Sequence, residues 1–187
     1  MKRFIFIIAY LVSNASFADE HELFVEQSQA AIIEFSTALK GSLMAAMQSG
    51  GPVGAINVCN QIAPVIANDL SKKYGLEIAR TSLKTRNPKN QPSAWEKEVL
   101  NQFEIRKKQG ENISTLSFDE SMTRGDRHEM LMMKAIPTGE LCLTCHGTNI
   151  SEPVQTKLNQ LYPEDKATGF ELGDIRGAFT IRKIVAY

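Results

Sequence analysis

Apolar residues in the first part of the chain recur every three or four positions, which is the spacing of an amphipathic helix. One such stripe runs from His21 to Met47 and ends at Gly50-Gly51-Pro52, a combination that stops helices. A second stripe runs from Val53 to Tyr74 and carries Cys59 on its apolar face. Pro64 lies inside this second stripe, so we expect a kink or a break there. The pattern therefore predicts long N-terminal helices.

The rest of the chain mixes short alternating segments, typical of strands, with further helices. Ser93 followed by Glu96 is a capping-box pattern that opens a helix running to Gln109. We interpret the polar stretch Asp119–Arg127 as the connection between two strands. The remaining predicted elements are strands over residues 76–83, 113–118, 129–136 and 179–185, a weak helix over residues 151–161, and loops over residues 85–92 and 162–173. Helices first and strands scattered later predict a single α+β domain with an antiparallel sheet.

The first residues have the pattern of an export signal. Lys2 and Arg3 precede the uncharged apolar run Phe4–Val12, and Ser16-Phe17-Ala18 places small residues where bacterial signal peptidases cleave. We expect residues 1–18 to be a signal peptide removed after Ala18, leaving a periplasmic domain of residues 19–187. The apolar run is shorter than the roughly 20 residues that span a bilayer, although an uncleaved anchor is the alternative. We expect no membrane span after cleavage.

Composition and charge exclude several classes of protein. The chain has 187 residues, 43% of them hydrophobic, and its 21 Lys and Arg balance its 21 Asp and Glu. Nucleic-acid binding needs a clustered basic surface, which neither the total nor any local run supplies. No phosphate-binding loop, Ser/His/Asp arrangement or paired carboxylates appear at recognisable spacing, so no enzyme class follows from the sequence.

The run Cys142-Leu143-Thr144-Cys145-His146 carries the clearest chemistry in the chain. Two thiols three residues apart on one helical turn can each form a thioether with a haem vinyl group, and the adjacent imidazole can bind the iron. A thioredoxin-type disulfide between these cysteines would normally follow a strand, a context that Pro137-Thr138-Gly139 does not provide. A zinc site would need a fourth ligand nearby. We predict one covalently bound haem c.

The second axial position on the iron is open to several residues. The candidates are His21, His128, Cys59 and the methionines, of which Met122, Met130, Met132 and Met133 precede the motif. Alternating Met130 and Met132 are more typical of strand packing, and His128 in a polar stretch is more typical of a solvated loop. A lone buried cysteine such as Cys59 is usually part of the core. A free thiol in an oxidising compartment is nevertheless a liability unless it is buried or used.

Several segments together give a resemblance to a known family. They cover residues 55–64, 80–83, 86–90, 141–147, 162–169 and 173–179, in order along almost all of the expected mature chain. The chain resembles the c-type haem domain of unknown function with a PAS-like fold that is found in cyanobacteria and proteobacteria. The resemblance implies a PAS-like fold, with His146 as proximal and Cys59 as distal iron ligand.

Thiolate ligation would favour a sensing role. An anionic sulfur stabilises ferric iron, and its bond can weaken on reduction and free a coordination site. This behaviour suits a sensor of redox state or of a diatomic gas, which would pass its signal to a separate partner protein. The alternative is a small monohaem electron-transfer cytochrome, in which a Met or His replaces Cys59. A weaker third hypothesis is a peroxidase-like enzyme.

Haem propionates need hydrogen-bond donors, and one segment is rich in them. Arg80, Arg86, Asn87 and Asn90 are our candidates, with Arg176 as a further one. The alternative for each is an ordinary solvated residue of a loop or a strand edge.

Overall fold

The computed structural model describes residues 8–186, with only the backbone for residues 8–18, 124 and 186. Residues 1–7 of the predicted signal peptide lie outside the described residues. Helix α1 (Ile8–Asn57) begins upstream of the predicted start at His21. Gly51 interrupts it with φ 63° and ψ −168°, and Pro52 follows, so the predicted break is confirmed. Its positive φ is a conformation that glycine adopts without strain.

A short π-helical turn, η1 (Val58–Ile62), separates α1 from α2 (Ala63–Tyr74). The Ala63 N–H donates to the Val58 carbonyl, one residue further back than in an α-helix. Pro64 lies in the first turn of α2 and has no N–H to donate. The predicted irregularity at Pro64 is confirmed, and it takes the form of a π turn that contains Cys59.

Four antiparallel strands form one sheet in the order β1-β4-β3-β2. They are β1 (Glu77–Thr81), β2 (Ser117–Arg124), β3 (Arg127–Pro137) and β4 (Ile175–Ala186). The expectation of a polar connection over residues 119–127 is wrong, because most of that stretch belongs to β2. An edge strand with largely exposed side chains needs no apolar alternation, and a tight turn at Gly125 (φ 63°) joins it to β3. Residues Ile113–Thr115, predicted as strand, form the 3₁₀ turn η3.

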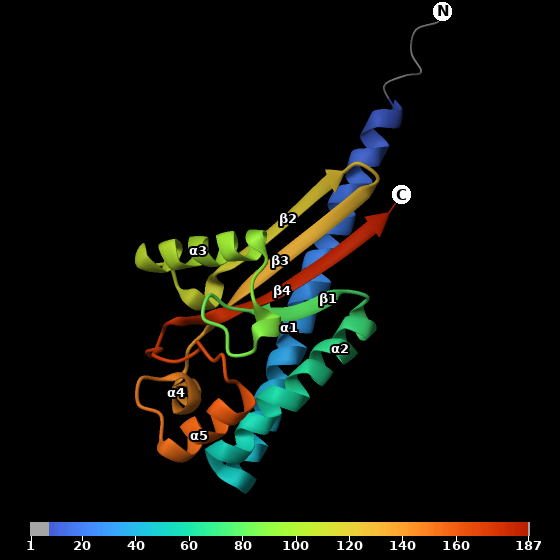
Figure 1. The fold of residues 1–187 in the computed structure, drawn as a ribbon. Coiled ribbons are helices and arrows are strands. Elements are labelled where there is room, and N and C mark those ends of the chain that lie inside the picture. Colours follow the sequence, from blue (N-terminus) through green and yellow to red (C-terminus); the bar gives the residue numbers. More distant parts are fainter. Residues whose placement is uncertain (1–7, 187) are drawn as a thin grey trace, which may run out of the picture.

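Helices cover both faces of the sheet (Figure 1). On one face α1 and α2 contribute Phe24, Phe35 and Leu70 to a core that includes Met130 and Met132 of β3. On the other face α3 (Ala94–Lys108) packs its apolar side against β3 and β4. The predicted capping box opens α3, since the Glu96 carboxylate accepts from the Ser93 N–H at 2.7 Å. The single α+β domain with an antiparallel sheet and a long N-terminal helix is confirmed.

Two short helices, α4 (Glu140–His146) and α5 (Glu152–Leu161), lie at the end of the sheet opposite the β2–β3 turn (Figure 1). The helix α5 buries Val154 and Leu158 against Ile56, near the end of α1. The 3₁₀ turn η2 (Pro88–Asn90) lies in the predicted loop after β1. This arrangement brings α4, the π turn and the loop after β1 to one end of the domain.

One expectation about membrane spans needs correction. The helical stretch Asp19–Tyr74 is long and apolar enough to cross a membrane by length and composition, although core helices of soluble proteins meet the same criterion. Here Phe24, Ala31 and Phe35 are buried at 0–1% exposure, in contact with the sheet or within the same core. Only 17% of the apolar window is buried in the domain, and Ile33 and Met44 are exposed, so packing accounts for part of the apolar residues of this helix.

Candidate functional site

The three cysteines lie together at the end of the domain that carries α4. Cys142 and Cys145 are on α4, and Cys59 is on the π turn between α1 and α2. All three are free thiols and half-buried. Burial raises the pKa of the Cys145 thiol, Arg86 opposes the rise, and Cys59 and Cys142 lie near enough to add to it. The fold thus brings Cys59 to the motif, which its distance along the chain did not guarantee.

Helix α4 ends at a glycine that the local geometry requires. The Gly147 N–H donates to the Leu143 carbonyl at 2.9 Å. A Cβ at position 147 would lie 2.6 Å from the same carbonyl oxygen, closer than real Cβ atoms approach. The Thr138 N–H donates to the Asp174 carbonyl at 2.8 Å and so ties the entry to α4 to the start of β4. Both ends of the motif helix are therefore fixed by the backbone.

His146 is held in one tautomer by a backbone carbonyl. Its Nδ1 lies 2.7 Å from the Ala167 carbonyl oxygen. A carbonyl only accepts, so Nδ1 carries the hydrogen and Nε2 keeps its lone pair. Burial holds the pKa of His146 well below its usual value, and Arg176 and Arg86 lower it further. A neutral imidazole with a free Nε2 is the form that binds a metal.

Arg86 contacts the motif from the segment that follows β1. Its Nε donates to the Asp165 carboxylate at 2.9 Å, and both side chains are buried, at 8% and 7% exposure. Its Nη2 donates to the carbonyls of Cys145 at 2.6 Å and Ala167 at 3.2 Å, and Nη1 lies 3.5 Å from His146 Nε2. All three nitrogens of this guanidinium therefore face groups of the protein, and the contact of Arg86 with a propionate stays a prediction.

Two further arginines add positive charge to the site. Burial and the nearby Arg86 and Arg80 lower the pKa of Arg176 to about 10, while Asp165 and Cys142 act in the opposite direction. Burial also lowers the pKa of Arg80, against an opposing effect of Cys59 and Tyr162. Their guanidinium carbons lie 5.2 Å from the ring centres of Phe170 (Arg176) and Phe35 (Arg80). Three guanidinium groups near one carboxylate suit an anionic ligand.

The two predicted asparagines make contacts within their own loop and with the end of β1. Asn87 Oδ1 accepts from the Lys89 N–H at 3.0 Å and caps η2. The Asn90 carbonyl accepts from the Thr81 hydroxyl at 3.0 Å. These contacts account for both residues as parts of the turn, and their role at a ligand stays a prediction.

The other candidate axial residues lie elsewhere. His128 is buried in the β2–β3 hairpin, with its ring nitrogens 3.0 Å from the hydroxyls of Ser121 and Thr123, so its interpretation as a solvated loop histidine is wrong. His21 Nε2 lies 3.4 Å from the Asp119 carboxylate. Met130 and Met132 are packed in the core, as predicted. This hairpin is at the end of the sheet opposite α4 (Figure 1).

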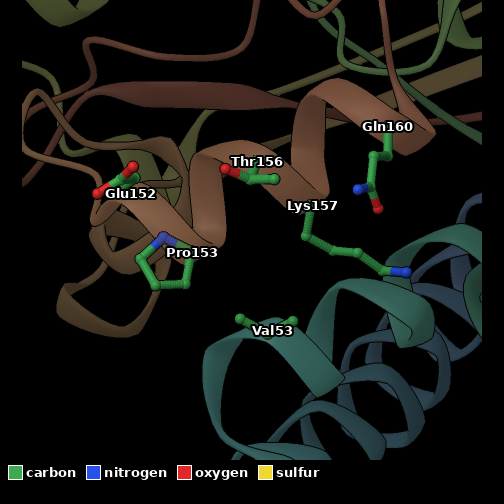
Figure 2. Close-up of a pocket in the computed structure, with 6 residues that line it drawn as sticks. All are labelled: Val53, Glu152, Pro153, Thr156, Lys157 and Gln160. Carbon is green, nitrogen blue, oxygen red and sulfur yellow. The ribbon is translucent and has the colours of Figure 1, made fainter.

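Two contributors to the site belong to no sequence motif. Asp165 lies in a segment that was predicted only as a loop, and the Ala167 carbonyl belongs to the backbone, which no sequence pattern reports. Asp165 lies in a polar run within residues 162–169, one of the segments that carry the resemblance to the haem-domain family, and this position could have marked it as a site residue. A separate, open groove of about 420 Å³ lies between α5 and Val53 and is lined by none of the predicted site residues (Figure 2).

Fold and site define a class of protein: a single α+β domain whose antiparallel sheet supports, at one end, a Cys-X-X-Cys-His helix beside a third cysteine and three arginines. The chain belongs to the Tll0287-like family, whose model matches residues 13–183. Among solved structures it is similar to the crystal structure of the cyanobacterial heme-protein Tll0287, with a TM-score of 0.66 and 23% identity over 87% of this chain and 96% of that chain. This similarity shows the fold. No curated protein matches the chain.

Proposed function

We propose that this protein binds one haem covalently through Cys142 and Cys145, with His146 as an iron ligand. The observation that carries the proposal is the hydrogen bond from His146 Nδ1 to the Ala167 carbonyl, because it puts the hydrogen on Nδ1 and leaves a lone pair on Nε2, on the same helix as two free thiols. That lone pair faces Arg86 Nη1 at 3.5 Å, and an iron bound at Nε2 would replace this contact. The similar solved structure is titled a heme-protein, which agrees with this assignment.

The chemistry of the donor set fits this group. Each thioether forms when a thiol adds across a vinyl double bond, so that sulfur bonds to one carbon, the hydrogen ends on the other, and no oxidant is needed. The propionates are anions, and Arg80 and Arg176 supply positive charge next to the motif. Once bound, the haem supplies an iron that changes oxidation state.

Cys59 is the proposed second iron ligand. Its position near Cys145 of the motif helix and near the buried Arg80 supports this. The π turn that carries Cys59 is an irregular segment between two helices, and such turns are frequent at functional sites. Ligation by a residue on such a segment allows the bond to be made in one oxidation state and lost in the other.

We further propose that the domain is a redox or gas sensor in the periplasm, exported with residues 1–18 as a signal peptide and acting through a separate partner protein. A small monohaem electron-transfer cytochrome is the second candidate. A midpoint potential matching respiratory donors, with fast electron exchange, would favour the cytochrome. N-terminal sequencing of the exported protein should begin at Asp19, and a terminus at Met1 would contradict cleavage.

The central experiment compares three proteins expressed with a c-type maturation system. Haem staining after denaturing electrophoresis should be positive for wild type and for Cys59→Ala, and lost in the Cys142→Ser/Cys145→Ser variant. The ferric optical and electron paramagnetic resonance spectra should show thiolate ligation in wild type and not in Cys59→Ala. No covalent haem in wild type would reject the proposal. Identical spectra for wild type and Cys59→Ala would show that Cys59 is not an iron ligand.

A further inference from the structure

We infer that the buried pair of Arg86 and Asp165 is a positioning device for His146, which selects the tautomer of the imidazole through the Ala167 carbonyl. The inference deepens the proposed function and rests on it for its consequences at the iron. Its structural part concerns only contacts within this chain.

The two oxygens of the Asp165 carboxylate accept hydrogen bonds from two different groups. Oδ2 accepts from Arg86 Nε at 2.9 Å, and Oδ1 accepts from the Ala167 N–H at 2.8 Å. The same guanidinium donates through Nη2 to the Ala167 carbonyl at 3.2 Å. The peptide groups on both sides of Ala167 are therefore fixed by one ion pair, and the carbonyl points at His146 Nδ1.

Arg86 also acts on the imidazole from the opposite side. Its Nη1 lies 3.5 Å from Nε2, and a guanidinium nitrogen only donates. A hydrogen on Nε2 would face another donor, whereas a lone pair faces a cation. Arg86 and the Ala167 carbonyl therefore favour the same tautomer, with hydrogen on Nδ1. Arg86 also donates from Nη2 to the Cys145 carbonyl at 2.6 Å, and this hydrogen bond fixes the guanidinium relative to α4.

The loop around Ala167 has backbone links as well, but these do not orient its carbonyl. Lys166 N–H donates to the Thr85 carbonyl at 2.9 Å, and Phe170 N–H donates to the His146 carbonyl at 3.0 Å. A third link joins the Gly169 N–H to the Gly147 carbonyl at 3.0 Å. None of the three bonds uses the Ala167 peptide groups, whose described partners are Asp165, Arg86 and His146. Removing one partner would also leave the other charge buried and uncompensated.

The test uses the full chain with Asp165→Asn, Arg86→Gln and the double variant Arg86→Gln/Asp165→Asn. Long-range ¹H–¹⁵N spectra of the haem-free protein report the tautomer of His146 directly. We expect Nδ1–H alone in wild type and a mixture of both tautomers in the single variants. The double variant, with neutral amides, should recover part of the wild-type population, so the effects are not additive.

Arg106→Gln is the matched control, because Arg106 also pairs with a carboxylate, Glu111, and donates to a carbonyl, that of Ser117 at 2.9 Å, but on the exposed side of α3. In the haem-loaded protein, the single variants at the site should hold about tenfold less haem and shift the midpoint potential, while the control should do neither. Arg86→Lys, which keeps the charge, serves if the Gln variants fail to fold.

The outcomes separate the two proposals. An unchanged tautomer and potential in Asp165→Asn, with covalent haem present in wild type, would overturn the positioning role alone. Wild type without covalent haem would reject the proposed function, while the tautomer spectra of the haem-free chain would still decide whether the pair orients His146.

Discussion

The two sides of the site are built in different ways. On one side, His146 is the last residue of a helix that ends at Gly147. Its Nδ1–H donates to a backbone carbonyl, and its ring lies beside the buried pair of Arg86 and Asp165. On the other side, Cys59 lies in a π turn between α1 and α2. The hydrogen bonds of the first side converge on the imidazole and its partners from three segments of the chain. On the second side the turn is defined by the irregular backbone bond from Ala63 to Val58, and its long-range hydrogen bond joins Tyr162 to Asn60, the residue after Cys59.

If His146 and Cys59 bind an iron as proposed, this difference would let one site combine a permanent ligand with a changeable one. A ligand fixed by several independent contacts keeps its position when the charge at its partner changes. A π turn is a local departure from the α-helical pattern, and we expect a residue on it to shift more readily than one held by several independent contacts. The three predictions below disturb first the rigid side, then the adjustable side, and last an exposed link between the two helices.

The largest effect is expected at Gly147. In Gly147→Ala the new Cβ meets the Leu143 carbonyl, so the end of α4 must unwind or shift. We expect the free energy of unfolding to fall by about 2 kcal/mol or more, with reduced haem attachment. Urea unfolding followed by circular dichroism measures the first effect, and haem staining the second.

Gly139→Ala, at the other end of α4, is the control because no atom lies within 4 Å of its Cβ. This substitution should lower the free energy of unfolding by about 1 kcal/mol or less. Equal losses in both variants would show that the clash does not matter.

The accuracy of the sequence analysis follows the range of the interactions involved. Gly51, the Ser93 capping box and the Cys142–His146 motif act within a few residues, and their consequences were predictable. Strand β2 was missed because its polar side chains reflect an edge position, which depends on the order of strands in the sheet.

The candidate site shows the same difference between short-range and long-range interactions. The motif gives the residues proposed to carry the chemistry, whereas the contacts around His146 come from a backbone carbonyl and from Asp165, which reach it through the tertiary fold. A carbonyl group is present in every residue, so composition and spacing carry no signal for it. The burial of His128 was missed for the same reason, since its partners become neighbours only in the hairpin.

An intermediate effect is expected at Pro64. In Pro64→Ala the regained N–H can donate to a carbonyl in the preceding turn, which favours α-helical bonding over residues 58–62 and rotates Cys59 about the helix axis. We expect roughly half of the thiolate-ligated ferric signal to be lost, with stability changed by about 1 kcal/mol or less. Electron paramagnetic resonance of the haem-loaded protein measures the loss. Val65→Ala, at an exposed neighbouring position, should leave the signal unchanged. A full thiolate signal in Pro64→Ala would mean that the packing of the helices, and not the missing N–H, maintains the π turn.

The smallest effect is expected from the exposed link between α1 and α2, in which Lys73 Nζ lies 2.7 Å from the Glu34 carboxylate and the Tyr74 hydroxyl donates to Glu34 at 3.0 Å. Both ends of the ion pair are solvated, so Lys73→Gln should change the urea midpoint by no more than the error of the measurement at moderate salt.

The hydrogen bond from Lys73 lowers the pKa of Glu34, and the one from Tyr74 adds to this effect. A lowered carboxyl pKa contributes stability above the pKa of the unfolded chain, and the contribution is lost as the pH falls through the folded value. Any difference between wild type and Lys73→Gln should therefore be present at neutral pH and absent in acid. A difference that persists in acid or in high salt would mean that Lys73 acts through packing, and that the angle between the helices carrying Cys59 is more firmly fixed than the comparison of the two sides implies.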